Sequence, residues 1–413
     1  MIELEREVEA LLGERLGREC LYAPSGRLAL YVALVVSLSP GDRVLMSPLT
    51  DDVVLFTLLA AGVRPVMAPL SPADGNIDPA AVPEAAWRGI RAVLTTNLYG
   101  LPDRVLELRA RCEKLGIVLI EDAAHAIETE VSGQPVGSFG DMSVFSLSKH
   151  VAGVGGALAF ADAASRRDLE RLRDEIVTPR GFRMRAADVL RPAVGKVLER
   201  LSLRHAVVRA RLALGRVERT EHRMPLRPQE LRQAQASLRG LDPFDSWVRV
   251  DKHDYRHRQR VRDMSGTLER LRALASDGAA RAEGVARLRE LATVAPAARR
   301  GDPLPLFRVP LLVQDRDAVA RVLEHEGTPT PLDYVYDPPL DDYAGSAYVD
   351  PSAAPAVARW WAAHVIPVDP LRADAALDAL RTLPGQVQRD SDPLAGPREG
   401  PGQGQDGRAA PAG

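Results

Sequence analysis

The chain has 413 residues, 46% of them hydrophobic, and its 54 basic and 56 acidic residues give a formal charge of −2. This composition predicts a globular protein with a large core, and the near-neutral charge gives no reason to expect nucleic acid or an anionic membrane as a partner. Two cysteines, Cys20 and Cys112, cannot form a disulfide framework or a four-ligand zinc site, so we expect no metal centre and a cytoplasmic location.

Residues 1–19 are predicted to form an N-terminal helix. Their charged, amphipathic pattern lacks the basic start and apolar middle of a signal peptide. No apolar run in the chain reaches the length of a membrane span, so we expect no membrane partner.

From about residue 20 to 160, segments typical of helices alternate with short apolar segments typical of strands. The predicted helices are 27–38, 52–62 and 102–116, and the predicted strands are 43–48, 64–70, 91–100, 117–124, 142–148 and 156–161. Buried strands that alternate with amphipathic helices favour a mostly parallel sheet covered on both faces, which is an α/β fold. In such sheets, ligands bind beyond the carboxyl ends of the strands.

The remaining chain predicts a division into domains. A large domain over 20–245 includes an arginine-rich helical segment, 165–232, which we interpret as a solvated helical face rather than a surface for phosphates or membranes. Residues 246–385 suggest a smaller C-terminal α+β domain, with long helices over 251–274 and 284–294. The Gly-, Pro- and Gln-rich segment 386–413 is predicted to be a disordered tail.

Lys149 follows an apolar run and precedes a glycine-rich turn. Only four of the 54 basic residues are lysine: Lys114, Lys149, Lys196 and Lys252. An arginine stays protonated in any protein environment, whereas a desolvated lysine can lose its proton and act as a nucleophile. A lysine between two buried strands therefore suggests chemistry, although a solvated strand-end lysine is the simpler interpretation when Lys149 is taken alone.

The neighbours of Lys149 fit an aldehyde cofactor such as pyridoxal phosphate (PLP). This cofactor needs a lysine for its Schiff base and an acid opposite its ring nitrogen. Asp122 follows a predicted buried strand and supplies the acid, and His125, about one helical turn later, is placed to contact the phenolic oxygen. Taken alone, Asp122 is better explained as a helix N-cap and His125 as a structural histidine.

Phosphate-binding groups are also present. Ser25, Gly26 and Arg27 open the first long helix, where backbone N–H groups and the helix dipole attract an anion, and Ser146 offers a further hydroxyl. A plain N-cap explains Ser25 equally well. The S-x-x-K string of Ser146 and Lys149 also occurs in penicillin-recognising enzymes, but the S-D-N and K-T-G strings of those enzymes are missing from this sequence.

Taken together, the motifs resemble the DegT/DnrJ/StrS family of PLP-dependent sugar aminotransferases, which have the fold type I architecture of the aspartate aminotransferase superfamily. The resemblance rests on six strings in family order: SGRLAL, PGDRVLMSPLT, GNIDPAAV, NLYGLPDRV, LGIVLIEDAAHA and PVGSFGDMSVFSLSKH. It runs nearly continuously from about residue 20 to 160, and a looser match covers LPLFRVPLLVQDRDAV through HVIPVDPL.

The resemblance implies a role for each residue. Lys149 forms the Schiff base and moves the substrate proton, Asp122 pairs with the ring nitrogen, and His125 contacts the ring hydroxyl. The phosphate is bound by Ser25, Gly26 and Ser146. It further implies a homodimer that moves an amino group from glutamate or glutamine to a keto group of a nucleotide-linked sugar or a cyclitol, in a biosynthetic route such as that of an antibiotic.

Three residues depart from the family pattern. Asp51 stands where a ring-stacking side chain is usual, Arg27 replaces a common threonine and favours phosphate binding, and Glu221 replaces an asparagine that reaches the partner's phosphate. Two alternatives therefore stay open. One is a PLP-dependent dehydratase or eliminase, in which histidine typically replaces the lysine and for which His150 is a candidate. The other is a non-catalytic regulatory or structural relative.

Overall fold

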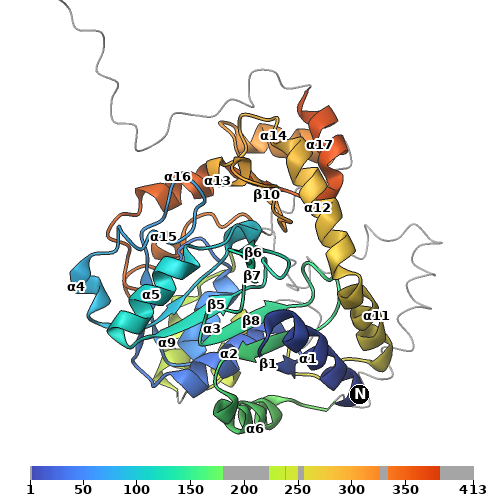
Figure 1. Cartoon of the computed structure of the whole chain (residues 1–413). Coiled ribbons are helices and arrows are strands. Elements are labelled where there is room, and N and C mark those ends of the chain that lie inside the picture. Colours follow the sequence, from blue (N-terminus) through green and yellow to red (C-terminus); the bar gives the residue numbers. More distant parts are fainter. Residues whose placement is uncertain (1, 180–222, 238, 250–254, 326–333, 382–413) are drawn as a thin grey trace, which may run out of the picture.

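The computed structural model describes residues 2–179, 223–237, 239–249, 255–325 and 334–381 (Figure 1). Glu221, the tail 386–413 and most of the arginine-rich segment lie outside the described residues. Of that segment, the structure describes the helix α6 (Arg166–Ile176) and the first part of α9 (Pro228–Ala236).

A seven-stranded sheet is at the centre of the described part of the chain, in the order β1-β9-β8-β5-β4-β2-β3 (Figure 1). Its strands are β1 (Glu19–Ala23), β2 (Arg43–Met46), β3 (Arg64–Met67), β4 (Ile90–Leu94), β5 (Val118–Asp122), β8 (Met142–Ser146) and β9 (Gly156–Phe160). Only β9 is antiparallel to its neighbours, β8 and β1. The predicted α/β class with a mostly parallel sheet is confirmed.

Helices cover both faces of the sheet because side chains alternate along each strand. In β2, for example, Val44 and Met46 pack into one cluster and Leu45 into another. The first face carries α6, α9, α2 (Gly26–Ser37), α3 (Asp52–Ala60) and α10 (Asp245–Val248). The second carries α1 (Ile2–Leu16), α4 (Glu84–Trp87), α5 (Val105–Leu115) and α11 (Val261–Arg272).

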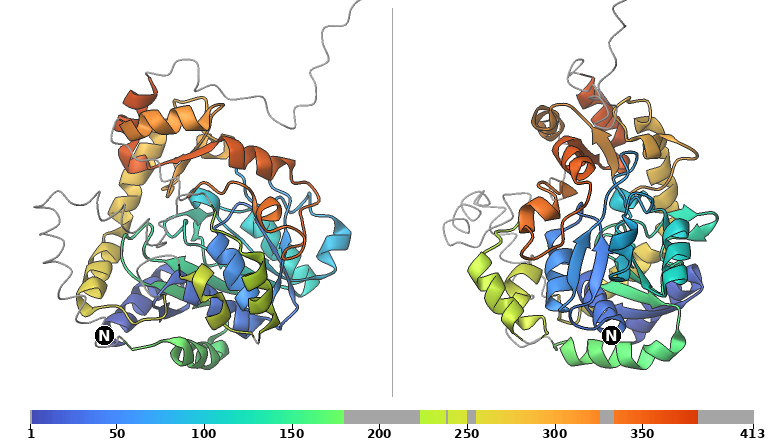
Figure 2. Two further views of the ribbon diagram at one scale, coloured as in Figure 1. Left: turned by 180° about the vertical axis from the view of Figure 1, so that it is seen from behind. Right: turned by 90° about the vertical axis from the view of Figure 1, so that its left-hand side faces the viewer.

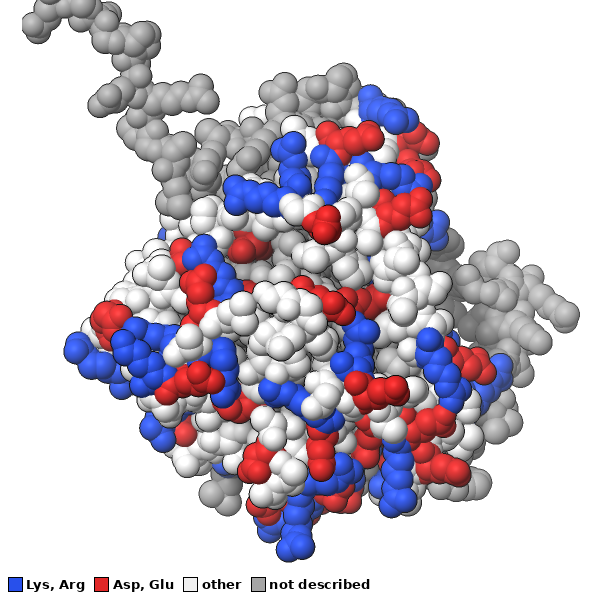
Figure 3. Space-filling view, viewed as in Figure 1, with Lys and Arg blue, Asp and Glu red and all other residues white. Residues whose placement is uncertain are grey.

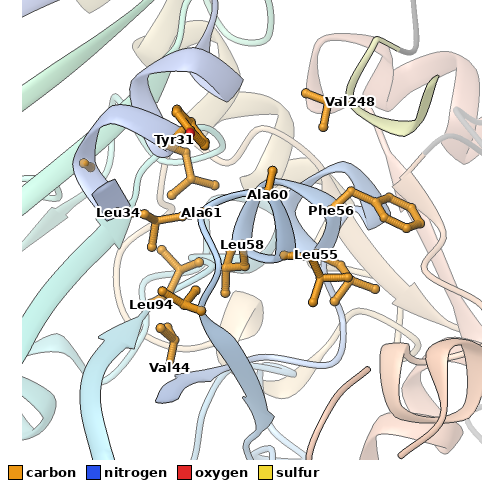
Figure 4. Packing of buried hydrophobic residues seen from close by; sticks show 14 of the residues in the cluster. Tyr31, Leu34, Val44, Leu55, Phe56, Leu58, Ala60, Ala61, Leu94 and Val248 are labelled. Carbon is orange, nitrogen blue, oxygen red and sulfur yellow. The ribbon is translucent and has the colours of Figure 1, made fainter. Parts of the chain in front are cut away.

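The largest cluster of buried side chains centres on α3 (Figure 4). In that view Leu58 lies toward Val44 and Leu94 of the strands, and Phe56 lies on the opposite side of the helix. The Phe56 ring stacks on Trp247 of α10 at 5.3 Å between centroids. Because α3 is buried around most of its circumference, its sequence is apolar nearly throughout. Each large apolar side chain contributes about 1.5–3 kcal/mol by its burial.

A second group of elements, which we call the C-terminal lobe, comprises the described residues between 274 and 381. It contains α12 (Leu274–Leu288), α13 (Pro296–Arg299), β10 (Val309–Leu312), α14 (Arg316–His325), α15 (Leu340–Ala344), α16 (Ala356–His364), β11 (Val365–Val368) and α17 (Ala373–Leu380). β10 and β11 form an antiparallel pair, and α12, α14 and α17 bury a core of their own against it. In Figure 2 the lobe sits on one end of the sheet-containing part.

The structure differs from the predicted elements in three places. The helix predicted over 251–274 begins only at Val261, and β1 was not predicted at all. The helix predicted over 284–294 is the end of α12, which begins at Leu274 and stops at Leu288. α1 ends at Leu16 because Gly17 adopts a left-handed conformation with φ +63°, which turns the chain into this strand. The domain boundary at residue 246 stays a prediction, since α11 still packs with α1 against the sheet.

The surface shows no concentration of one charge on the face seen in Figure 3, where basic and acidic side chains alternate. Many charged side chains of the described residues form ion pairs, such as Arg43 and Arg64 with Asp350. Among the described residues, no helix is both long and apolar enough to cross a membrane.

A buried carboxylate, Asp103, fixes the loop after β4. Its oxygens accept hydrogen bonds from the backbone N–H groups of Ile77 (3.0 Å), Thr96 (2.8 Å) and Asn97 (2.9 Å). Burial raises the pKa of Asp103 to about 6, against the opposing effect of these donors. The Asn97 side chain in turn donates to the Asp122 carbonyl at 2.9 Å. Asp103 therefore supports the end of β5 indirectly, through Asn97.

Asp103→Asn is therefore expected to lower the free energy of unfolding by about 1–3 kcal/mol, because an amide NH₂ replaces one acceptor and faces backbone donors. Chemical denaturation at pH 8, where the wild-type carboxylate is ionised, measures this. The control is Asp42→Asn, because the partly exposed Asp42 caps the Ser39 N–H and an asparagine can do the same. Equal stability of the two variants would contradict the expectation.

Candidate active site

A cavity of about 380 Å³ lies at the carboxyl ends of β5 and β8, beside the first turn of α2. It is lined by six of the seven predicted site residues, which are Ser25, Gly26, Arg27, Asp122, Ser146 and Lys149. The seventh, His125, contacts Lys149 directly. The structure thus brings together residues that are up to 124 positions apart in sequence, as between Ser25 and Lys149.

Lys149 lies in the turn between β8 and β9. The turn is held by hydrogen bonds from the Leu147 N–H to the Gly155 carbonyl (3.0 Å) and from the Gly153 N–H to the Leu147 carbonyl (2.7 Å). The Lys149 Nζ lies 2.8 Å from the His125 Nε2 and 5.7 Å from the centre of the Tyr334 ring. The amine is therefore fixed against an imidazole and an aromatic face.

Asp122 is the last residue of β5, directly beside β8 in the sheet. One carboxylate oxygen accepts the Ala124 N–H at 2.9 Å. Burial raises the pKa of Asp122, and the positive charge of Lys149 is the main opposing influence. A buried acid of this kind gains most from a cationic partner, because a positive charge restores the ionised form.

His125 is buried, and burial lowers the pKa of its imidazole well below the usual value, with Lys149 adding to the effect. The ring is therefore neutral at physiological pH. An ammonium group has only donors, so the charged Lys149 donates to an unprotonated Nε2.

The His125 ring belongs to an aromatic column. Phe307 stacks on it at 4.9 Å and Tyr99 at 6.3 Å between centroids, and Tyr336 continues the stack beyond Tyr99 at 6.3 Å. The interplanar angles are 16°, 12° and 6°. Tyr99 and His125 come from loops at the end of the sheet, whereas the other two rings come from the C-terminal lobe. The column therefore joins the two parts of the molecule at the lysine.

The cavity lining also includes a helix N-terminus, which is held there by close backbone packing. A Cβ on Gly26 would lie 3.2 Å from the Phe145 carbonyl oxygen, and a Cβ on Gly156 would lie 2.4 Å from the Gly26 nitrogen. Glycines at these positions thus let the first turn of α2 approach β8 and β9, which exposes main-chain dipoles to the cavity. The Ser146 hydroxyl, in the same lining, lies 3.0 Å from the Ser148 hydroxyl.

Ser25 acts as the N-cap of α2: its hydroxyl accepts the Leu28 N–H and donates to the Tyr255 carbonyl, both at 3.1 Å. Its single proton is thereby engaged within the protein. Arg27 donates to the Val248 carbonyl at 2.7 Å, and its guanidinium lies 5.8 Å from the Tyr255 ring centre. Both residues line the cavity, but their observed contacts are with the protein itself.

Asp51, where the family pattern suggested a ring-stacking residue, is the N-cap of α3 and accepts the Val53 N–H at 3.0 Å. It also lines the cavity and raises the pKa of Asp122. The acid therefore has a local structural role at this position.

Sequence reasoning missed the contribution of the C-terminal lobe. Tyr334 lines the cavity and Phe307 stacks on His125, yet both lie far along the chain, and the only sequence signal was the tyrosine-rich loop around Tyr334. Tyr336 and Tyr343 instead flank the Arg223 guanidinium at 5.6 Å each. Among the described residues, no group of metal-binding side chains is large enough to hold an ion.

Two known proteins are similar to part of this chain. The chain is 36% identical over 176 residues to a UDP-N-acetyl-3-dehydro-alpha-D-glucosamine 3-aminotransferase of Acidithiobacillus ferrooxidans, covering 41% of this chain and 47% of the relative. It is 33% identical over 158 residues to an L-glutamine:2-deoxy-scyllo-inosose aminotransferase of Streptomyces kanamyceticus, covering 37% of each. These matches thus span less than half the length of either relative.

A solved structure shares the fold along almost the whole chain. It is the GDP-4-keto-6-deoxy-D-mannose-3-dehydratase of E. coli with bound hydrated PLP, with a TM-score of 0.62, 16% identity and 91% coverage of both chains. Together with the parallel sheet, this likeness establishes the predicted fold type I architecture. The model of the DegT/DnrJ/EryC1/StrS aminotransferase family matches residues 1–257, more than half of the 413 residues, so the chain belongs to this family.

Proposed function

We propose that the protein is a PLP-dependent aminotransferase that moves an amino group from glutamate or glutamine to a keto group of a nucleotide-linked sugar or a cyclitol. The observation that carries the proposal is the placement of the Lys149 amine and the Asp122 carboxylate in one cavity, at the ends of adjacent parallel strands. Aminotransferases of this family depend on PLP, and the two relatives described above act, by their names, on a UDP-sugar and a cyclitol.

The residues present fit this cofactor. The cavity volume of about 380 Å³ is within the range of small-molecule sites. Its lining combines an amine, a desolvated acid and a helix N-terminus whose close packing depends on Gly26 and Gly156. When bound, PLP supplies an aldehyde that takes up an amino group and a ring that withdraws electrons from the attached carbon.

In this proposal each residue has a defined task. Asp122 would pair with the ring nitrogen, and its desolvated position would strengthen that charge pairing. Lys149 would be the residue that holds the aldehyde and carries a proton at Nζ, and neutral His125 accepts a hydrogen bond at Nε2 and orients the amine. Gly26, Ser146 and the first turn of α2 would hold the phosphate, and Arg27 would add positive charge there. Ser25 can donate to the phosphate only after its hydroxyl leaves the Tyr255 carbonyl.

Homodimerisation and a cytoplasmic location are further parts of the proposal. The family resemblance supports the first. The second is supported by Cys20 and Cys112, which are buried free thiols in the described structure, because a reducing compartment such as the cytoplasm keeps thiols free.

Dehydration is the weaker alternative, despite the likeness to a dehydratase structure. In family members that dehydrate, histidine typically stands at the lysine position, and this chain has Lys149 there. The adjacent His150 does not line the cavity, and both of its ring nitrogens are hydrogen-bonded inside the protein. A non-catalytic role also loses support, because the departure at Asp51 is explained by its N-cap contact.

The first test is cofactor binding. Purified wild-type protein is expected to bind PLP with an absorbance band that Lys149→Ala abolishes, because the variant lacks the attaching amine. Lys114→Ala is the matched control, since Lys114 is exposed at the end of α5. A wild-type protein that binds no PLP at saturating concentration would refute the proposal.

The second test concerns Asp122. Asp122→Asn is expected to slow the glutamate-driven half-reaction by about 100-fold or more, equivalent to about 2.7 kcal/mol, because an amide cannot hold the ring nitrogen protonated. Stopped-flow absorbance after mixing with glutamate measures this rate. Asp78→Asn, which alters a carboxylate outside the cavity lining, should leave the rate unchanged.

The third test identifies the acceptor. The protein is incubated with glutamate or glutamine and a panel of nucleotide-linked keto-sugars and cyclitol ketones, and products are read by mass. We expect an amine in place of a ketone in one of these two classes. Loss of water from the sugar without amine incorporation would favour the dehydratase.

A further inference from the structure

His150 directly follows Lys149 in sequence but faces the protein interior. Its side chain has 0% exposure and does not line the cavity. Its Nε2 lies 2.6 Å from the His125 carbonyl oxygen, and its Nδ1 lies 2.8 Å from the Glu128 Oε2. The buried polar ring therefore needs an explanation other than direct participation at the cavity.

The hydrogen-bond partners fix the protonation pattern of this ring. A carbonyl only accepts, so the His150 Nε2 carries a hydrogen and donates to His125. One further proton then lies between Nδ1 and the Glu128 carboxylate, whichever of the two atoms holds it. The pair is neutral as a whole in both cases, and its buried polar atoms at these contacts are satisfied.

His125 makes two contacts with the turn that carries Lys149. Its imidazole meets the Lys149 amine, and its carbonyl meets the side chain of the very next residue. The turn after β8 is thus attached to residue 125 twice, once through a side chain and once through the main chain. Because the His150 bond fixes the peptide that carries His125, it restricts where the His125 ring can lie.

Glu128 is itself held from α12. Arg281 approaches its Oε2 at 3.5 Å and lies 3.7 Å from Asp369 in the C-terminal lobe. Gly278, one turn earlier on the same helix, leaves the space that the carboxylate occupies, since a Cβ there would come within 2.5 Å of the Glu128 Oε1. This missing side chain is what allows the carboxylate to reach His150.

We propose that His150 and Glu128 form a positioning pair that holds the His125 main chain, and thereby the His125 ring, against the amine of Lys149. The purpose of the pair rests on the proposed aminotransferase function. Its geometry concerns only residues of this chain, so it can be tested without the cofactor. Neither residue touches the cavity, and both act through His125.

The test measures the reactivity of the lysine in cofactor-free, full-length protein. Trace acetylation with acetic anhydride is read by peptide mass spectrometry, with the exposed Lys114 as internal reference. In His150→Asn the shorter amide no longer reaches the His125 carbonyl. The His125 ring is then no longer held in place, and the Lys149 amine loses its hydrogen-bond acceptor. The Lys149 to Lys114 labelling ratio should rise about fivefold, the factor that corresponds to about 1 kcal/mol.

Two matched variants separate positioning from general destabilisation. His150→Gln places an amide N–H near the site of Nε2 but no group at the site of Nδ1, so its ratio should lie between those of the wild-type protein and His150→Asn. His364→Asn alters a histidine that also contacts a main-chain carbonyl, that of Val313 at 2.9 Å, but outside the cavity lining, and should leave the ratio unchanged. A folded His150→Asn protein with the wild-type ratio would overturn the proposal.

Loss of cooperative unfolding in His150→Asn would mean that this variant is not properly folded. In that case the Gly278→Ala variant tests the positioning pair instead. The added methyl displaces Glu128 without removing a polar group, and alanine is the better helix former, so this variant should fold and raise the ratio. Its control is Gly266→Ala in α11, where the new Cβ meets only Arg270 at an ordinary 3.5 Å. An unchanged ratio in Gly278→Ala rejects the positioning pair. A parallel PLP titration of wild-type protein reports separately on the proposed function.

Discussion

The parallel pairing of β5 with β8 is the constraint on which the site depends. In this register Ile120 lies opposite Met142 and Asp122 opposite Val144, so the two strands end at the same edge of the sheet. The acid is then the last residue of one strand, and the turn after the other strand carries the lysine. Because both strands are apolar and buried on both faces, a slip in register would expose core side chains. Core packing thus fixes the relative positions of the two polar groups.

The carboxylates buried near this edge are stabilised mainly by backbone amides. Glu121, next to Asp122, accepts the N–H groups of Gly137, Phe139 and Gly140 and thereby holds the loop before β8. Asp103 performs the same task for the loop after β4. Each of these acids accepts several backbone N–H groups, so its hydrogen bonds order a loop. Only Asp122 among the three has Lys149 as the main influence lowering its pKa.

Much of the fold could be predicted from the sequence because it depends on local patterns, whereas the site residues were predicted by combining such patterns with the family resemblance. The strand ending at Asp122 is apolar, and the glycines near Lys149 mark a turn. Contacts made at long range could not be predicted in this way. No pattern reveals that Phe307 stacks on His125, or that the Ser25 hydroxyl is engaged by a carbonyl 230 residues away. The inward orientation of His150 likewise depends on its contact with Glu128, and the sequence alone does not predict this contact.

The aromatic column has a mechanical consequence. In order, its four rings come from the C-terminal lobe, twice from the sheet-containing part, and again from the lobe, so Phe307 and Tyr336 hold the outer positions and Tyr99 and His125 lie between them. The lobe therefore contacts the inner pair of rings through both outer rings. A displacement of the lobe relative to the sheet would break at least one of these stacked contacts, so the position of the lobe and the support of the imidazole beside Lys149 are coupled.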